Sequence, residues 1–116
     1  MTTNESILYV PIHHSRVKQQ QKEEQRAIAT FVENEESSSD GFDYVIIGGD
    51  TNASPSVVRQ WKPANTSILI EERDPVTTRS CKRIDNIIYS DTMSEEFTIY
   101  RDTPFTHYPI WSSFQN

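Results

Sequence analysis

The chain has 116 residues, enough for one small domain, and 34% hydrophobic residues argue against a disordered acidic tail. Its formal net charge of -6 counts against a non-enzymatic nucleic-acid binder, because such binding would depend on local cations or a bound metal. The single cysteine, Cys81, excludes an internal disulfide and a multi-cysteine zinc site.

The N-terminal segment shows no recognisable targeting signal. Residues 1–6 contain no basic cluster, and the apolar run 7–12 is too short for a signal-peptide core or a membrane span. We therefore expect an intracellular, soluble protein without a membrane partner, although its compartment is unknown.

The first half of the chain predicts a strand, a helix and a second strand. Residues 7–12 are β-rich, and Pro11 within them indicates a strand end or an edge strand. Residues 16–35 lack glycine and proline, which predicts a helix with Ser15 as its N-cap. Residues 44–47 run apolar into two glycines, as a buried strand does. This order predicts a crossover unit against one face of a sheet, with a helical apolar face formed by Ala27, Ile28, Phe31 and Val32.

The second half predicts shorter elements. Ser54 and Pro55 can open a short helix that extends through Trp61, and residues 67–70 can form a short strand. Three further β-rich runs follow at 84–90, 97–100 and 107–114. We therefore expect an α/β (α+β) chain with five or six strands and one long helix, in a single domain over residues 1–116.

The predicted strand at 44–47 ends at two glycines and delivers an acid and an amide two positions apart, Asp50 and Asn52. Alternate residues of an extended backbone point the same way, so both side chains can address one site. Asp50 can orient or deprotonate water, and Asn52 can hold a phosphate oxygen or ligate a metal. The alternative is an Asx-turn that only caps the loop.

Two further positions can carry chemistry. Asp85 lies in an apolar strand, and burying a carboxylate alone is costly, so it needs a partner such as a histidine. The alternatives are an outward-facing residue or a salt bridge to Arg83 or Arg79. His107 opens the last predicted strand, where a lone histidine is otherwise a packing or surface residue. His13 and its neighbour His14 should face opposite sides of a strand, so one of them at most can join a shared site.

The ordered set of motifs resembles the endonuclease/exonuclease/phosphatase superfamily, which includes deoxyribonuclease I and the apurinic endonucleases. The resemblance extends from about residue 7 to residue 114. It is carried by four segments, Pro11-Ile12-His13, Gly49-Asp50-Thr51-Asn52, Arg83-Ile84-Asp85 and His107-Tyr108-Pro109.

The resemblance implies a role for each matching residue. Asp50 would position or activate the attacking water, and Asn52 would orient the site or bind phosphate. Both would also be ligands of the metal. Asp85 would pair with His107, which would bind the scissile phosphate. His13 would be a second phosphate-facing histidine. The implied cofactor is Mg²⁺, with Mn²⁺ as a substitute.

The resemblance also implies a partial domain. The family fold is a sandwich of two sheets flanked by helices, and this chain matches its C-terminal half, without the N-terminal asparagine and glutamate that ligate the metal. Thr106 stands where the family has a metal-binding aspartate. Half a sandwich would expose the inner face of its sheet, which favours a homodimer or pairing with a chain that supplies the missing half.

Three functions fit these residues. A metal-dependent endonuclease acting on DNA accounts best for the segments around His13 and His107. Arg83, in a basic patch with Arg79 and Lys82, and the aromatic Tyr108 can contact such a substrate, although cations before a strand are commonly solvated and aromatics commonly belong to the core. The alternatives are an inactive remnant or partner-completed interaction module, and a phosphoesterase acting on inositol phosphates or phospholipid headgroups.

Overall fold

The computed structural model describes residues 5–38 and 41–115, which form two helices and six strands. In chain order these elements are β1 (Ile7–His13), α1 (Lys18–Glu36), β2 (Tyr44–Asp50), α2 (Pro55–Trp61), β3 (Thr66–Ile68), β4 (Asp85–Ser90), β5 (Ser94–Ile99) and β6 (Ile110–Gln115). The number of strands agrees with the prediction, and the short helix at Pro55 is present.

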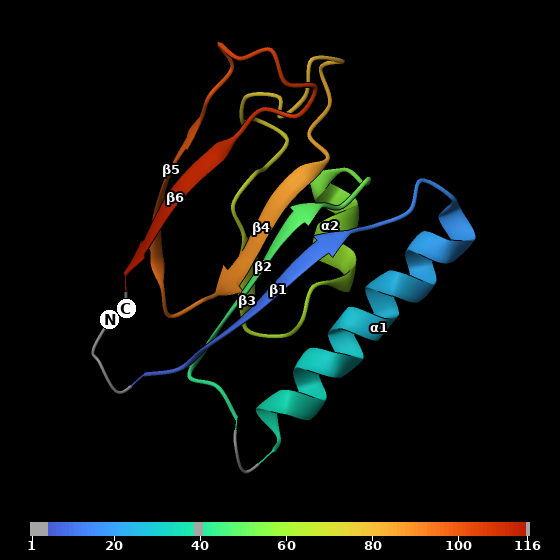
Figure 1. Ribbon diagram of the computed structural model, residues 1–116. Coiled ribbons are helices and arrows are strands. Elements are labelled where there is room, and N and C mark those ends of the chain that lie inside the picture. The colour runs from blue at the N-terminus through green and yellow to red at the C-terminus, as the bar shows by residue number, and fades with distance from the viewer. Residues whose placement is uncertain (1–4, 39–40, 116) are drawn as a thin grey trace.

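The strands form two sheets (Figure 1). The larger has the order β1-β2-β4-β3, with β1 parallel to β2 and the other pairs antiparallel. The predicted crossover is therefore confirmed, since α1 connects two adjacent parallel strands. β1 lies at the edge of the sheet, which explains how Pro11, without an N–H group, is accommodated. β5 and β6 form the second, antiparallel sheet.

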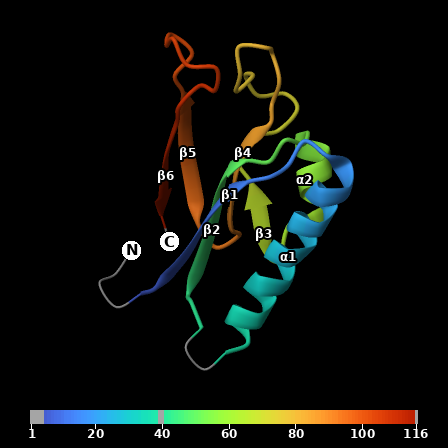
Figure 2. The ribbon, with the colours of Figure 1, turned by 45° about the vertical axis from the view of Figure 1, so that its right-hand side comes forward.

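The four-stranded sheet lies between the two helices and the β5-β6 sheet (Figure 2). The alternation of side chains along each strand assigns them to one layer or the other. Ile47 and Ile88 pack with α1 and α2, whereas Ile46 and Ile87 pack toward β5 and β6. We call these the helix face and the cleft face of the sheet.

Helix α1 differs from its prediction at its start and in its buried face. Its N-cap is Val17, and the Ser15 hydroxyl instead accepts a hydrogen bond from the Val17 N–H at 3.0 Å, in a turn just before the helix. Ala27 and Phe31 are exposed, because the inward-facing stripe follows the alternating four- and three-residue spacing of Gln21, Gln25, Ile28 and Val32. The two glutamines are buried because their side chains form hydrogen bonds there. A prediction based on apolar residues alone therefore did not include them.

The last strand also begins later than predicted. β6 starts at Ile110, and His107 forms only an isolated bridge with Thr78. Pro109 donates no hydrogen bond, although its carbonyl accepts one from the Tyr100 N–H at 2.9 Å. His107 is therefore held in a loop rather than in a strand.

Gly49 permits the close approach of β1 and β2 near their ends. Its φ is +144°, and a Cβ atom there would lie 2.0 Å from the carbonyl oxygen of Ile12. A side chain at this position would force the two strands apart immediately before Asp50. Within the described residues, no helix combines the length and apolarity needed to cross a bilayer.

Candidate active site

Strand register places three polar side chains in a row across the sheet. His13 of β1 is opposite Asp50 of β2, and Asp50 is opposite Asp85 at the start of β4. Directly opposed residues on neighbouring strands project from the same face, with their Cβ atoms about 5 Å apart. The row therefore lies on the cleft face, where the last residues of β1 and β2 meet the first residue of β4.

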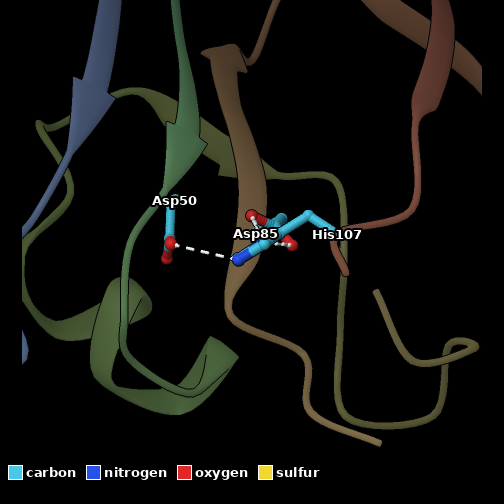
Figure 3. A group of neighbouring side chains, drawn as sticks. All are labelled: Asp50, Asp85 and His107. Atoms are coloured by element: carbon cyan, nitrogen blue, oxygen red, sulfur yellow. Dashed lines mark hydrogen bonds and ion pairs between the residues drawn. The ribbon is translucent and has the colours of Figure 1, made fainter. Parts of the chain in front are cut away.

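His107 approaches this row from a separate loop and pairs with Asp85 (Figure 3). Its Nδ1 lies 2.9 Å from both carboxylate oxygens of Asp85. This contact assigns the Nδ1–H tautomer, in which the ring donates to the carboxylate. Nε2 then faces Asp50 Oδ2 at 3.7 Å. The partner predicted for the strand acid is thus His107, and neither Arg79 nor Arg83.

The two members of the pair are positioned by one short segment. The Tyr108 N–H donates to the Thr77 carbonyl at 2.7 Å, which holds the chain just after His107. The Thr77 hydroxyl in turn accepts from the Asp85 N–H at 3.2 Å. Thr77 is fully buried and lies between the two residues, so it keeps their distance fixed. No motif pointed to Thr77, because its role depends on the neighbouring bridge between Thr78 and His107, which are 29 residues apart in sequence.

The ionisation of Asp85 reflects two opposing influences. Burial raises the pKa of this carboxyl above its ordinary value, while the hydrogen bond from the His107 ring works in the opposite direction. The Asp85 side chain is 13% exposed, whereas that of His107 is 43% exposed. The pair therefore has a sheltered carboxylate and an imidazole that is open to a ligand.

Asn52 sits in the Asx-turn that the sequence offered as an alternative. Its N–H donates to Asp50 Oδ1 at 2.9 Å, its φ is +48°, and its side-chain amide donates to the His14 carbonyl. The Gln21 side chain donates to the Asn52 carbonyl at 2.9 Å, so α1 also supports this loop. Asn52 nevertheless lines the same cleft as His107, and its turn orients the Asp50 carboxylate. Asn52 therefore stabilises the loop through its turn and also lines the candidate site.

The three residues shown in Figure 3 can hold a cation. One ligand atom from each of Asp50, Asp85 and His107 lies within 4.8 Å of the others. The gap of 3.7 Å between Asp50 Oδ2 and His107 Nε2 is shorter than twice a metal–ligand bond of about 2.1 Å. Carboxylate oxygens suit a hard divalent cation, so the donor set fits a divalent metal.

The remaining predicted residues are placed differently. His13 lies at the edge of the row, with 81% of its side chain exposed and Nε2 3.7 Å from Asp50 Oδ2. Tyr108 lines an open cavity of about 350 Å³ between the two sheets, beside Asp85 and His107. Arg83 lies outside that cavity, and its Nε donates to the Asp74 carbonyl. The structure therefore brings His13 and Tyr108 to the site and directs Arg83 away from it.

His14, unlike the exposed His13, is buried and lies away from the candidate site. It is buried on the helix face, and its ring centroid lies 5.4 Å from that of Trp61. Neither of its ring nitrogens finds a hydrogen-bond partner among the described residues. Burial lowers the pKa of His14 below the ordinary histidine value. The expectation that adjacent histidines face opposite sides is therefore met.

Two solved structures resemble this chain over most of its length. CdtB, the biologically active subunit of cytolethal distending toxin, matches 90% of the chain with a TM-score of 0.68 and 15% identity. Cytolethal distending toxin from Actinobacillus actinomycetemcomitans matches 94% with a TM-score of 0.65 and 21% identity. No family profile matches the chain, and no curated protein does.

These identities are low, so the likeness concerns the fold. The aligned regions make up 47% and 49% of the two toxin chains, so this chain spans about half of their length. The two sheets with flanking helices correspond to the architecture that the motifs implied. The chain has a deoxyribonuclease I-like α/β fold, of which it contains about half.

Proposed function

We propose that the chain is a metal-dependent phosphodiester hydrolase that acts on DNA as an endonuclease. The observation that carries this proposal is the Asp85–His107 pair, with the free Nε2 of His107 directed at the Asp50 carboxylate. A structural histidine would be expected to bury its second nitrogen or bond it elsewhere. Here Nε2 lies 3.7 Å from Asp50 Oδ2, beyond hydrogen-bonding distance, on a side chain that is 43% exposed, so a reacting phosphate can reach it.

Each residue has a role that its geometry supports. Asp50, whose Oδ1 accepts from the Asn52 N–H, keeps Oδ2 available to accept a proton from an attacking water. His107, when protonated on both nitrogens, donates from Nε2 to a phosphate oxygen, and Asp85 stabilises that cation and fixes the ring. Asn52 and the exposed His13 would provide further contacts to the phosphate.

A divalent metal would bind at Asp50, together with Asn52 or with the neighbouring Asp85. We propose Mg²⁺, with Mn²⁺ as a substitute, because the ligands are mainly hard oxygen donors. When bound, such an ion neutralises part of the negative charge on a phosphodiester.

The site would be completed by a second polypeptide unit. We infer that this chain corresponds to the C-terminal half of the fold, and that the other half covers the cleft face and supplies further metal ligands. The open cavity and the exposed Tyr9, at 61%, support this view, because an interior face is left accessible. That half could come from a longer polypeptide, a second copy or a separate chain.

The same observations favour one alternative function, a partner-completed interaction module without catalysis of its own. Thr106 supports it, because a neutral hydroxyl binds a hard cation far more weakly than a carboxylate does.

The direct test is nicking of supercoiled plasmid by the purified chain in Mg²⁺ or Mn²⁺. We expect nicking that disappears with EDTA and in His107→Ala, but persists in Lys22→Gln, a substitution on the exposed surface of α1. Circular dichroism would verify that all variants are folded. A folded wild-type chain that leaves the plasmid intact would overturn the catalytic proposal for this chain and favour the interaction module.

A further inference from the structure

A second, polar cleft opens on the other side of His107. It has a volume of about 310 Å³. Four segments contribute to it, the β1-α1 loop, the β2-α2 loop, the turn before β4 and the loop that carries His107. The lining residues are Arg16, Asn52, Thr78, Ser80, Lys82, Ile84, Thr106 and His107. It shares Asn52 and His107 with the candidate active site, so the two regions are continuous.

The charge of this cleft is opposite to that of the whole chain. None of its lining residues is acidic, although the chain carries a net charge of -6. Arg16 and Lys82 are exposed, and across the described ranges 5–38 and 41–115 the side chain of neither residue forms an ion pair or a hydrogen bond. Arg59 and Arg73, by contrast, lie against Glu71 and Glu72. Two unpaired cations thus line a recess without acids.

The turn before β4 presents hydroxyl groups toward the same recess. It is closed by the Thr77 N–H donating to the Lys82 carbonyl at 2.8 Å and by the Lys82 N–H donating to the Thr78 hydroxyl at 3.1 Å. Thr78 is buried and its hydroxyl lies 3.0 Å from that of Ser80, which is exposed. Ser80 and Thr106 are therefore hydroxyl donors beside the two cations, a combination that suits a phosphate group.

We propose that this cleft binds a second phosphate of the DNA backbone, next to the phosphate held at His107. The inference rests on the proposed function and specifies its substrate as a polynucleotide rather than a molecule with one phosphoester. Arg16 and Lys82 supply the charge, and Ser80 and Thr106 supply neutral hydrogen bonds. These residues determine substrate class, whereas the reacting phosphate is handled by Asp50, Asp85 and His107.

The first test measures binding without hydrolysis. A short fluorescein-labelled DNA duplex is titrated in EDTA at a series of NaCl concentrations, and Kd is obtained from anisotropy. The slope of log K against log salt is negative, and each neutralised phosphate adds roughly 0.9 to its magnitude. Arg16→Gln/Lys82→Gln should therefore reduce that magnitude by about 1 to 2. The control Lys22→Gln/Arg26→Gln carries the same charge change on α1 and should leave the slope unchanged. Equal slopes for wild type and R16Q/K82Q, or absence of wild-type binding at the lowest salt, would overturn the subsite.

The second test compares substrates under hydrolytic conditions. For R16Q/K82Q we expect KM for plasmid DNA to rise roughly tenfold at low salt, because the second phosphate is no longer held. The rate with bis(4-nitrophenyl) phosphate, which has a single phosphodiester, should not change. An equal loss on both substrates would contradict a separate subsite.

The two tests separate this inference from the proposed function. If the wild-type chain hydrolyses neither substrate while the salt slopes differ as expected, the subsite stands and the catalytic proposal fails. If both substrates are hydrolysed and R16Q/K82Q alters neither the slope nor KM, catalysis stands and the subsite fails.

Discussion

The two faces of the four-stranded sheet are built from alternating residues of the same strands, yet they have different tasks. The helix face is closed, with Ile47 and Ile88 completely buried beneath α1 and α2. The cleft face is partly open, with Tyr9 exposed and a cavity between the two sheets. The polar row of His13, Asp50 and Asp85 lies on that open face.

The difference shows that one step along a strand decides between packing and chemistry. His13 and His14 are neighbours in sequence, but one is exposed beside Asp50 and the other is buried against Trp61. A one-residue slip of β1 would exchange them. Substitutions on the cleft face should therefore reduce activity with little loss of stability, and those on the helix face should do the reverse.

The largest effect should follow from Asp85→Asn. The amide would donate to His107 Nδ1 and stabilise the wrong ring tautomer, so plasmid nicking should fall by up to about 10⁴-fold. The thermal unfolding midpoint should change little. A nicking rate within a few fold of wild type would show that the pair has no part in catalysis, and a collapse of the fold would place Asp85 among the structural residues.

Adjacent residues of β2 provide a matched pair for stability. Ile47→Ala removes a fully buried side chain from the helix face and should cost about 2–5 kcal/mol of unfolding free energy in urea. Ile46→Ala, on the partly buried cleft face, should cost clearly less. Equal losses would mean that the two faces are equally well packed, which contradicts the comparison.

Metal binding should stabilise the cleft face without any reaction. An excess of Mg²⁺ or Mn²⁺ at about 100 times its Kd should raise the free energy of unfolding by about 2.7 kcal/mol. Thermal denaturation with and without the ion would measure this shift, and Asp50→Asn should abolish it. A shift of the same size in Asp50→Asn would place the metal elsewhere.

Much of this architecture follows from local patterns in the sequence. The apolar runs at β1, β2 and β4 and the glycine-free stretch of α1 identify the crossover, and Pro11 marks the edge strand. The motifs identify Asp50, Asp85 and His107, because each is an unusual residue at the end of an apolar strand or two positions before a proline. The pairing of Asp85 with His107 could be predicted from the sequence, because a carboxylate within an apolar strand needs a partner and the motifs supply a histidine.

The parts that escaped prediction depend on contacts between distant segments. Gln21 is buried because the carbonyl of Asn52 lies opposite it, which no helical pattern of apolar residues reveals. His107 precedes β6 because Pro109 has no N–H group to donate and the ladder with β5 ends at Ile110, while His107 forms its own isolated bridge with Thr78. Arg83 was predicted to contact substrate because it is a cation close to Asp85 in sequence. Its side chain instead contacts the Asp74 carbonyl, and this contact depends on the conformation of the loop between the two residues, which the sequence pattern does not reveal.

The smallest expected effect concerns pH and the helix face. Burial lowers the pKa of His14 in the folded state, whereas in the unfolded chain it titrates near the ordinary value of 6.5. The unfolded state therefore takes up the proton first, so this contribution to stability is present above about pH 6.5 and is lost as the pH falls below it. His14→Phe should keep the ring contact with Trp61 and lose less unfolding free energy between pH 7 and pH 5. Urea titrations at several pH values would measure this, with His13→Phe as the exposed control. Parallel pH profiles for wild type and His14→Phe would indicate that the buried ring takes up protons in the folded state as readily as in the unfolded chain.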